Sequence, residues 1–103
     1  MKSILILALL VVSSAAITVA QNPGKSVFAS KCAICHGVDG KGNTSIGKSL
    51  KIADLHSESA AKMSDADLKS VITNGKNKMP PFKGKLTDAQ LDQVVSYIRD
   101  LQK

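Results

Sequence analysis

The sequence predicts an all-α domain, and three observations lead to this fold class. Residues 87–101 carry apolar side chains at the spacing of one helix face, namely Leu91, Val94, Val95, Ile98 and Leu101. A second helical pattern begins at Ser64, which is followed by acidic residues that suit the start of a helix. After residue 20, no segment alternates apolar and polar residues with the period of two that a half-buried strand shows.

The first 20 residues differ from the rest and predict an export signal. Lys2 gives a positive start, residues 4–12 are aliphatic or alanine, and residues 13–20 turn to small side chains. This is the layout of a secretory signal peptide, with cleavage expected after Ala20 or after Ala16. An uncleaved membrane anchor is the alternative, but a span needs about 20 apolar residues and this run is shorter.

We therefore expect residues 1–20 to be a signal peptide and residues 21–103 to form one periplasmic domain, with no stable membrane insertion after cleavage. Phe28, Phe82 and Tyr97 are the only aromatic residues, and tryptophan is absent. Domains of this size bury only around 60% of their surface and usually need a disulfide, a metal or a bound group. A bound group is expected to fill the centre.

The first expected helix runs from about residue 23 or 24 to Cys35. Gly37 and Gly40 follow it and stop it. The stretch 37–55 is predicted to be mostly loop, with a short helix near residues 50–54.

The second and third expected helices have clear local signals at their ends. Ser64 is a good N-cap, and Asn74-Gly75 ends that helix with residues that tolerate a left-handed turn. Thr87 and Gln90 form a T-x-x-Q capping box at the start of the third helix. The sequence therefore predicts three main helices separated by loops.

The segment KCAICHG, residues 31–37, holds both cysteines and one of the two histidines. Such a segment is typical of a disulfide redox pair, of part of a zinc site, or of a haem attachment point. The thioredoxin type of redox pair expects C-x-x-C beside a βαβ pattern, and no strand is predicted here. Structural zinc needs four ligands, and the remaining ligand of the favoured types is His56, whose polar surroundings are typical of a solvated residue.

The third interpretation explains all three side chains together. C-x-x-C-H is the attachment signature of c-type haem. Positions i, i+3 and i+4 share one face of a helical turn, so Cys32, Cys35 and His36 point the same way. Two thiols can then join the vinyl groups at one haem edge while the imidazole reaches the iron. The sequence predicts one covalently attached haem c.

A haem held by one histidine has an open face unless the protein supplies a second ligand, for which Met63, Met79 and His56 are candidates. Met63 precedes the Ser64 cap, where it can pack on Leu68 as a hydrophobic staple.

Met79 has no such local explanation. It lies in the polar loop NGKNKMPPFKG, and the two prolines after it reduce the freedom of that loop. A stiff loop suits a thioether that must stay at bonding distance from iron. We expect His36 and Met79 to be the two iron ligands, an arrangement that raises the reduction potential relative to two histidines.

With these residues in place, the chain resembles a class I cytochrome c over nearly all of residues 21–103. Gly24-x-x-x-Phe28-x-x-x-Cys32 is similar to the N-terminal helix of that family, and the Met79-Pro80-Pro81-Phe82 segment resembles the ligand loop of its small bacterial members. Val94 and Tyr97 fall where the C-terminal helix of the family meets Gly24 and Phe28. The resemblance implies an all-α class I cytochrome c fold with one haem.

The chain departs from the family pattern at one point. Many members have a proline after the attachment motif, whose carbonyl accepts the hydrogen bond of the axial histidine, and none occurs here between His36 and Met79. A metal-bound histidine almost always has such a partner. We expect a backbone carbonyl near residues 45–47 to take this role.

The predicted function is that of a one-electron carrier and not an enzyme. Lysines near the two ligand motifs are expected to steer the protein, as a monomer, to acidic surfaces of a reductase and a terminal oxidase in a respiratory chain: Lys31, Lys41, Lys48, Lys76, Lys78, Lys83 and Lys85. Nucleic acid is not an expected partner, because the chain is exported and poor in stacking aromatics. The alternatives are an electron-transfer subunit of a larger dehydrogenase or oxidase, and a haem peroxidase or gas-binding protein.

Overall fold

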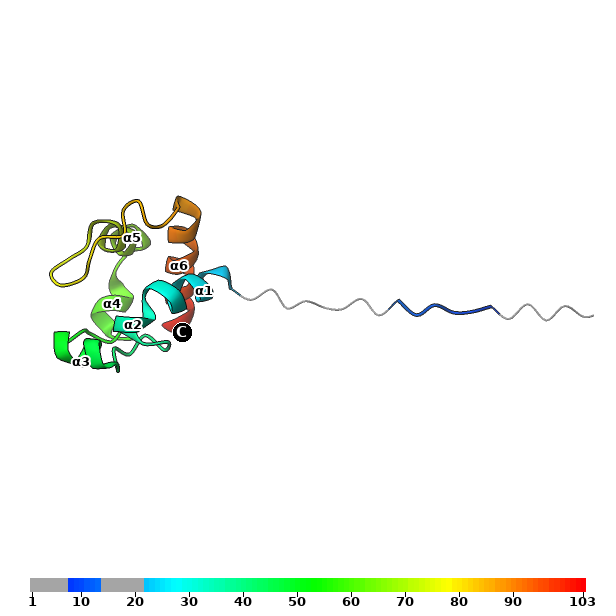
Figure 1. Ribbon diagram of the computed structural model, residues 1–103, viewed down its shortest axis with the longest axis horizontal. Helices are drawn as coiled ribbons and strands as arrows, with labels where there is room; N and C mark the ends of the chain where they lie inside the picture. The colour runs from blue at the N-terminus through cyan, green and yellow to red at the C-terminus, as the bar shows by residue number, and fades with distance from the viewer. Residues whose placement is uncertain (1–7, 14–21) are drawn as a thin grey trace, which may run out of the picture.

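The computed structural model describes residues 8–13 and 22–103, and its helices all lie in the second of these ranges (Figure 1). They are α1 (Pro23–Lys31), α2 (Ala33–His36), α3 (Ser45–Leu50), α4 (Glu58–Lys62), α5 (Asp65–Asn74) and α6 (Asp88–Leu101). Within the described residues, β-type pairing is limited to an isolated bridge between Lys76 and Met79. The all-α prediction is confirmed.

The predicted export signal lies largely outside the described residues. Residues 8–13 have no regular secondary structure, and the two expected cleavage points, after Ala16 and after Ala20, fall in the part that is not described. Among the helices of residues 22–103, none has the length and apolar character needed to cross a membrane.

The first expected helix is divided in two at Cys32. Asn22 caps α1 by accepting the backbone N–H of Gly24 at 3.0 Å, and Pro23 occupies the first turn, where its missing N–H is not needed. Cys32 has φ −117° and ψ −34°, outside ideal helical geometry, although its N–H still donates to the carbonyl of Phe28. The prediction of one helix to Cys35 was wrong at this residue, and α2 is a separate short turn.

The second and third expected helices are confirmed as α5 and α6. The Ser64 hydroxyl accepts the N–H of Asp67 at 3.1 Å, and the helix ends before Gly75. At the other helix, the N–H of Gln90 donates to the Thr87 hydroxyl at 3.1 Å while the Gln90 side chain accepts the Thr87 N–H at 3.0 Å. Both hydrogen bonds of the predicted capping box are therefore present.

The region between the attachment motif and α5 is more helical than predicted. The short helix expected near residues 50–54 lies earlier, in α3, because the Thr44 hydroxyl caps its start and Lys51 ends it in the left-handed region at φ 56°. The helix α4 was not predicted; Ser57 caps it by accepting the N–H of Ala60.

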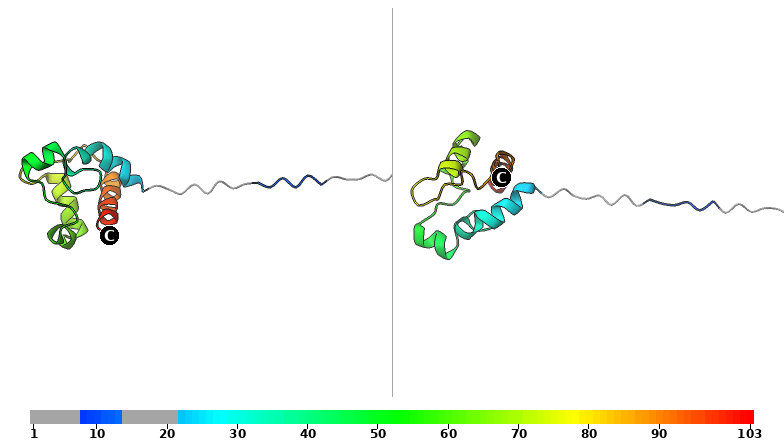
Figure 2. Two further views of the ribbon diagram at one scale, coloured as in Figure 1. Left: turned by 90° about the horizontal axis from the view of Figure 1, so that it is seen from below. Right: turned by 45° about the horizontal axis from the view of Figure 1, so that its top comes forward.

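The core forms where α1 and α5 pack against α6 (Figures 1 and 2). Its buried centre consists of Val27, Phe28, Leu68, Ile72, Val94, Val95 and Ile98. The ring centroids of Phe28 and Tyr97 lie 5.3 Å apart, within the range of favourable aromatic pairs. The predicted contact between the first and last helices is confirmed, and it fixes the helix that leads into the cysteine motif.

Candidate functional site

A cavity of about 780 Å³ opens beside this core, within the size range of small-molecule sites. Its walls come from the attachment motif at residues 31–36, from residues 50–63, from Val71 of α5 and from the loop 76–82. The wall side chains include Ile34, Leu50, Ile52, Leu55, Val71 and Phe82. The structure brings Cys32, Cys35, His36 and Met79 to this one cavity, although they come from two distant parts of the chain.

The two cysteines are free thiols on the cavity wall. Burial, and next the neighbouring Cys35, raise the pKa of Cys32 to about 11. The backbone of this turn is held from the next helix, because the Thr44 hydroxyl donates to the Cys35 carbonyl at 2.8 Å and accepts the Gly47 N–H. Sequence reasoning did not select Thr44, although a threonine before a short helical stretch is a recognisable cap signal.

The backbone of His36 is held by hydrogen bonds to Cys32 and from Gly42, at 3.0 and 2.7 Å. The Nδ1 atom of its side chain is buried and has no partner among the described residues, which costs free energy in a protein interior. Burial lowers the pKa of His36, so the imidazole is neutral at pH 7 and has a nitrogen lone pair available for a metal. Its ring centroid lies 6.4 Å from that of Phe28 in the core.

The expected acceptor for His36 near residues 45–47 is not found. These residues belong to α3 and not to a loop, so their carbonyls serve helical hydrogen bonds. The Gly47 carbonyl, for example, accepts the N–H groups of Lys51 and Ile52. That expectation was wrong because it treated residues 45–47 as a loop and did not use the cap signal of Thr44.

The loop that carries Met79 is a tight turn. Lys76 and Met79 exchange backbone hydrogen bonds at 3.2 and 2.9 Å, and Asn77 between them adopts φ 54°. Gly75 before the turn has φ 75°, and a Cβ atom there would lie 2.6 Å from the Met79 carbonyl oxygen. The loop therefore depends on a glycine for both conformation and space.

The same loop is also attached to α5 after its prolines. The N–H of Phe82 donates to the Ile72 carbonyl at 3.0 Å, and the N–H of Lys83 donates to the Thr73 carbonyl at 3.0 Å. The backbone at Met79 is thus held between two points of attachment, which limits the movement of the loop.

The other two candidates for the sixth ligand differ in position. Met63 lines the same cavity and packs against the core that contains Leu68. His56 does not belong to the cavity wall; its Nδ1 atom lies 2.7 Å from a carboxylate oxygen of Asp54, whose pKa is lowered by hydrogen bonds from this histidine. The cavity therefore holds two thioethers and one imidazole.

The lysines selected from the sequence are divided between different places. Lys31, Lys76 and Lys78 line the cavity, and Lys51, which was not selected, joins them. The other four selected lysines do not line the cavity: Lys41, Lys48, Lys83 and Lys85. Three of the seven selected lysines thus line the cavity, and their role in docking remains a prediction.

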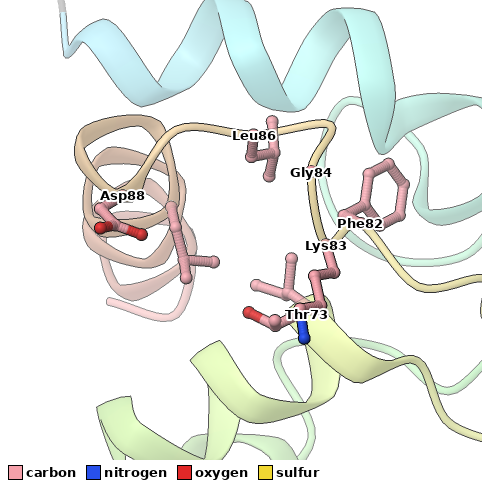
Figure 3. A pocket seen from close by; sticks show the side chains of 8 residues that line it. Thr73, Phe82, Lys83, Gly84, Leu86 and Asp88 are labelled. Atoms are coloured by element: carbon pink, nitrogen blue, oxygen red, sulfur yellow. The ribbon is translucent and has the colours of Figure 1, made fainter.

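A second, smaller cavity of about 200 Å³ lies between α5, the loop 82–86 and α6 (Figure 3). Phe82 and Leu86 form part of its wall, and Thr73, Lys83 and Asp88 are the polar residues around it. Its lining does not include Cys32, Cys35, His36 or Met79. Phe82 lines both cavities and therefore separates the larger site from this one.

The donor set of the larger cavity fits one covalently held haem. Two thiols, a neutral imidazole and a thioether meet in an apolar cavity, and the imidazole has a buried nitrogen that the described residues leave without a partner. Within the described residues there is no cluster of three or more His, Cys, Asp or Glu side chains that would hold a bare metal ion. The zinc interpretation has no support in this geometry.

Comparison with known proteins points to the same chemistry. Residues 19–98 match the family described as cytochrome C oxidase, cbb3-type, subunit III. The chain is 42% identical to cytochrome c6 of Synechocystis sp. over 77 residues, which cover 75% of this chain and 62% of that protein. It is 38% identical to cytochrome c6 of Nostoc sp. over 86 residues, or 84% of this chain and 75% of the relative.

A solved structure is similar as well. The KustC0563 c-type cytochrome superposes with a TM-score of 0.71 at 32% identity, covering 78% of this chain and 98% of that one.

Proposed function

The chain belongs to the class I c-type cytochromes, and we propose from this membership that it is a monohaem one-electron carrier and not an enzyme. The observation that carries the proposal is the meeting of Cys32, Cys35, His36 and Met79 in one apolar cavity. When bound there, a haem would supply an iron that can carry one electron as Fe(II) or Fe(III).

Cys32 and Cys35 are proposed to hold the haem through two thioether bonds. Each thiol adds across one vinyl group, so the sulfur takes one carbon and the thiol hydrogen goes to the other, without net oxidation or reduction. Both thiols lie on the cavity wall, and the Thr44 hydroxyl holds the backbone between them and α3. These contacts help to hold the attachment motif against α3 in the folded protein.

His36 and Met79 are proposed to be the two axial ligands. The neutral imidazole offers a lone pair, and the tight turn around Met79 keeps the thioether in place although a bond between iron and a thioether is weak. Filling both axial positions leaves no open site for peroxide or gas. This favours electron transfer over the peroxidase or gas-binding alternative.

The lysines at the cavity support a docking surface for acidic partners. Lys31, Lys51, Lys76 and Lys78 line the opening, and Asp54 is the acidic residue among them. A surface of one sign steers a partner of the opposite sign and raises the association rate at low salt. We propose that the protein is exported to the periplasm, cleaved after Ala20 or Ala16, and shuttles as a monomer between acidic sites of a reductase and a terminal oxidase.

A second candidate function is that of an electron-transfer subunit in a larger oxidase complex. The description of the matching family, which names an oxidase subunit, favours it. Purification of the protein from its natural membranes distinguishes the two functions. A free carrier leaves the membranes in a salt wash, whereas a subunit stays in a stable complex.

The proposed ligation is tested by comparing Met79→Ala with Met63→Ala in the purified holoprotein. The two residues line the same cavity, so Met63→Ala is a matched control for the loss of a thioether and its volume. We expect a pyridine haemochrome spectrum of haem c from both variants. Loss of Met79 alone should abolish the weak band of the oxidised protein in the red and allow the reduced protein to bind carbon monoxide.

Two results would overturn the ligation. If Met63→Ala loses the red band and Met79→Ala keeps it, Met63 is the ligand. If the unmodified protein already binds carbon monoxide at neutral pH, the sixth position is open and the carrier function fails.

A further inference from the structure

One wall of the cavity takes little part in the packing between helices. Residues 50–63 supply Leu50, Ile52, Leu55 and Met63 to the cavity. Among the helices described, broad packing contacts join α1 to α6, α1 to α2, α2 to α3 and α5 to α6, but none of them involves α4. Leu55 and Met63 pack against the buried core, and the Leu55 N–H donates to the Gly40 carbonyl at 2.8 Å. Further contacts to this wall come from the end of α6.

Arg99, in the last turn of α6, reaches this wall with its whole guanidinium group. Its Nη2 donates to the carbonyl of Met63, and its Nη1 donates to the carbonyl of Ala61 at 3.4 Å. Its Nε donates to a carboxylate oxygen of Asp65 at 2.8 Å. The side chain is 28% exposed, so these contacts are partly shielded from water.

The position of the guanidinium has a clear physical basis. Ala61 and Met63 lie at the C-terminal end of α4, where helix carbonyls lack partners and a positive charge is favourable. Asp65 lies in the first turn of α5. The planar guanidinium group of arginine can bind the end of α4 and the start of α5 at once. A lysine ammonium group cannot do so with the same geometry.

Gln102 extends the same attachment. Its Nε2 donates to the Leu55 carbonyl at 2.9 Å, and its Oε1 accepts from Nη1 of Arg99 at 2.8 Å. The end of α6 therefore contacts the wall at residue 55 and at residues 61–65. Both contact points border side chains that line the cavity.

We propose that Arg99 is a positioning residue that holds residues 55–63 as the wall of the haem cavity and thereby keeps water from the cofactor. The inference rests on the proposed function, since it concerns the environment of the bound haem. Access of water to a haem favours the more highly charged Fe(III) state and lowers the reduction potential. Arg99 thus helps to set the potential without touching the ligands.

The test compares Arg99→Gln and Arg99→Lys with Lys69→Gln in the holoprotein. Lys69 pairs with Asp92 between α5 and α6, so its loss removes one positive charge and one interhelical ion pair without touching the wall. Two quantities are measured: the midpoint potential, and the amide hydrogen exchange of residues 55–63. Thermal melting is followed in parallel as a measure of general stability.

We expect both Arg99 variants to lower the midpoint potential and to speed exchange in residues 55–63 by about tenfold. Lys69→Gln should lower the melting temperature without either effect. Arg99→Lys separates geometry from charge, because it keeps the positive charge and loses the planar guanidinium group with its several donors.

The proposal is overturned if Arg99→Lys behaves like the unmodified protein, since charge alone would then explain the effect of Arg99→Gln. It is also overturned if the Arg99 variants lower only the melting temperature. If Arg99→Gln yields no folded protein, Arg99→Lys and Gln102→Ala decide the question. Failure of the proposed function would appear separately, as the lack of a haem c spectrum in the unmodified protein.

Discussion

At the scale of single residues, Gly24 shows how one missing side chain positions the site. A Cβ atom at this residue would lie 2.0 Å from the carbonyl oxygen of Gln93 and 2.9 Å from the Cβ of Tyr97. The backbone of α1 therefore touches the backbone of α6 at this point. This close crossing fixes the position of α1, and α1 in turn leads into Cys32.

We predict that Gly24→Ala destabilises the protein by about 3 kcal/mol, at the upper end of the range for overpacking, because a backbone carbonyl cannot move aside. Chemical denaturation of the holoprotein measures this change. The control is Gly84→Ala, since Gly84 has φ 78° but nothing within 4 Å of its added Cβ. That variant should lose only about 1 kcal/mol, from the left-handed backbone. Equal losses would contradict the crowding argument.

Some residues of the candidate site could be predicted from the sequence and others could not. The spacing of Cys32, Cys35 and His36 within one turn was enough to group them, because local geometry determines it. The selection of Met79 over Met63 rests on the proline context, and the structure puts both thioethers at the cavity. The part played by Arg99 had no local signal, since its contacts are 34 to 38 residues away.

At the scale of helices, the elements that combine a cap with a clear apolar stripe were predicted best. The helices α5 and α6 have a capping serine and a capping box next to clear apolar stripes, so their bounds follow from nearby residues. The helices α3 and α4 are only 6 and 5 residues long and have no such stripe. Helices this short depend on tertiary contacts, which the sequence does not display locally.

The capping box of α6 allows a test at this scale. We predict that Thr87→Ala lowers the free energy of unfolding by about 1 kcal/mol, because it removes the acceptor of the Gln90 N–H. Thermal or chemical denaturation measures the loss. Ser96→Ala is the control, since Ser96 is exposed within the same helix and also loses only a hydroxyl. A loss in the control as large as in Thr87→Ala would show that the cap is unimportant.

At the scale of the whole molecule, the buried core is small beside the cavity that adjoins it. The buried core cluster has seven apolar residues in the described chain, while the cavity has a volume of about 780 Å³. The cavity is open to solvent, so without a bound group water would cover its apolar walls and the stabilisation from their burial would be lost. A bound haem would therefore supply a large part of the apolar core.

This argument predicts that the chain folds only after haem attachment. The variant with both Cys32→Ser and Cys35→Ser should be largely unfolded, with little helical circular dichroism and rapid amide exchange even in α1 and α6, where contact between helices is otherwise broadest. The single variant Cys32→Ser is the control, because one thioether and the iron ligands can still retain the haem, so it should stay helical with reduced stability. A double variant that is colourless yet has the helix content and slow exchange of the holoprotein would refute the argument, since the seven core residues would then be sufficient by themselves.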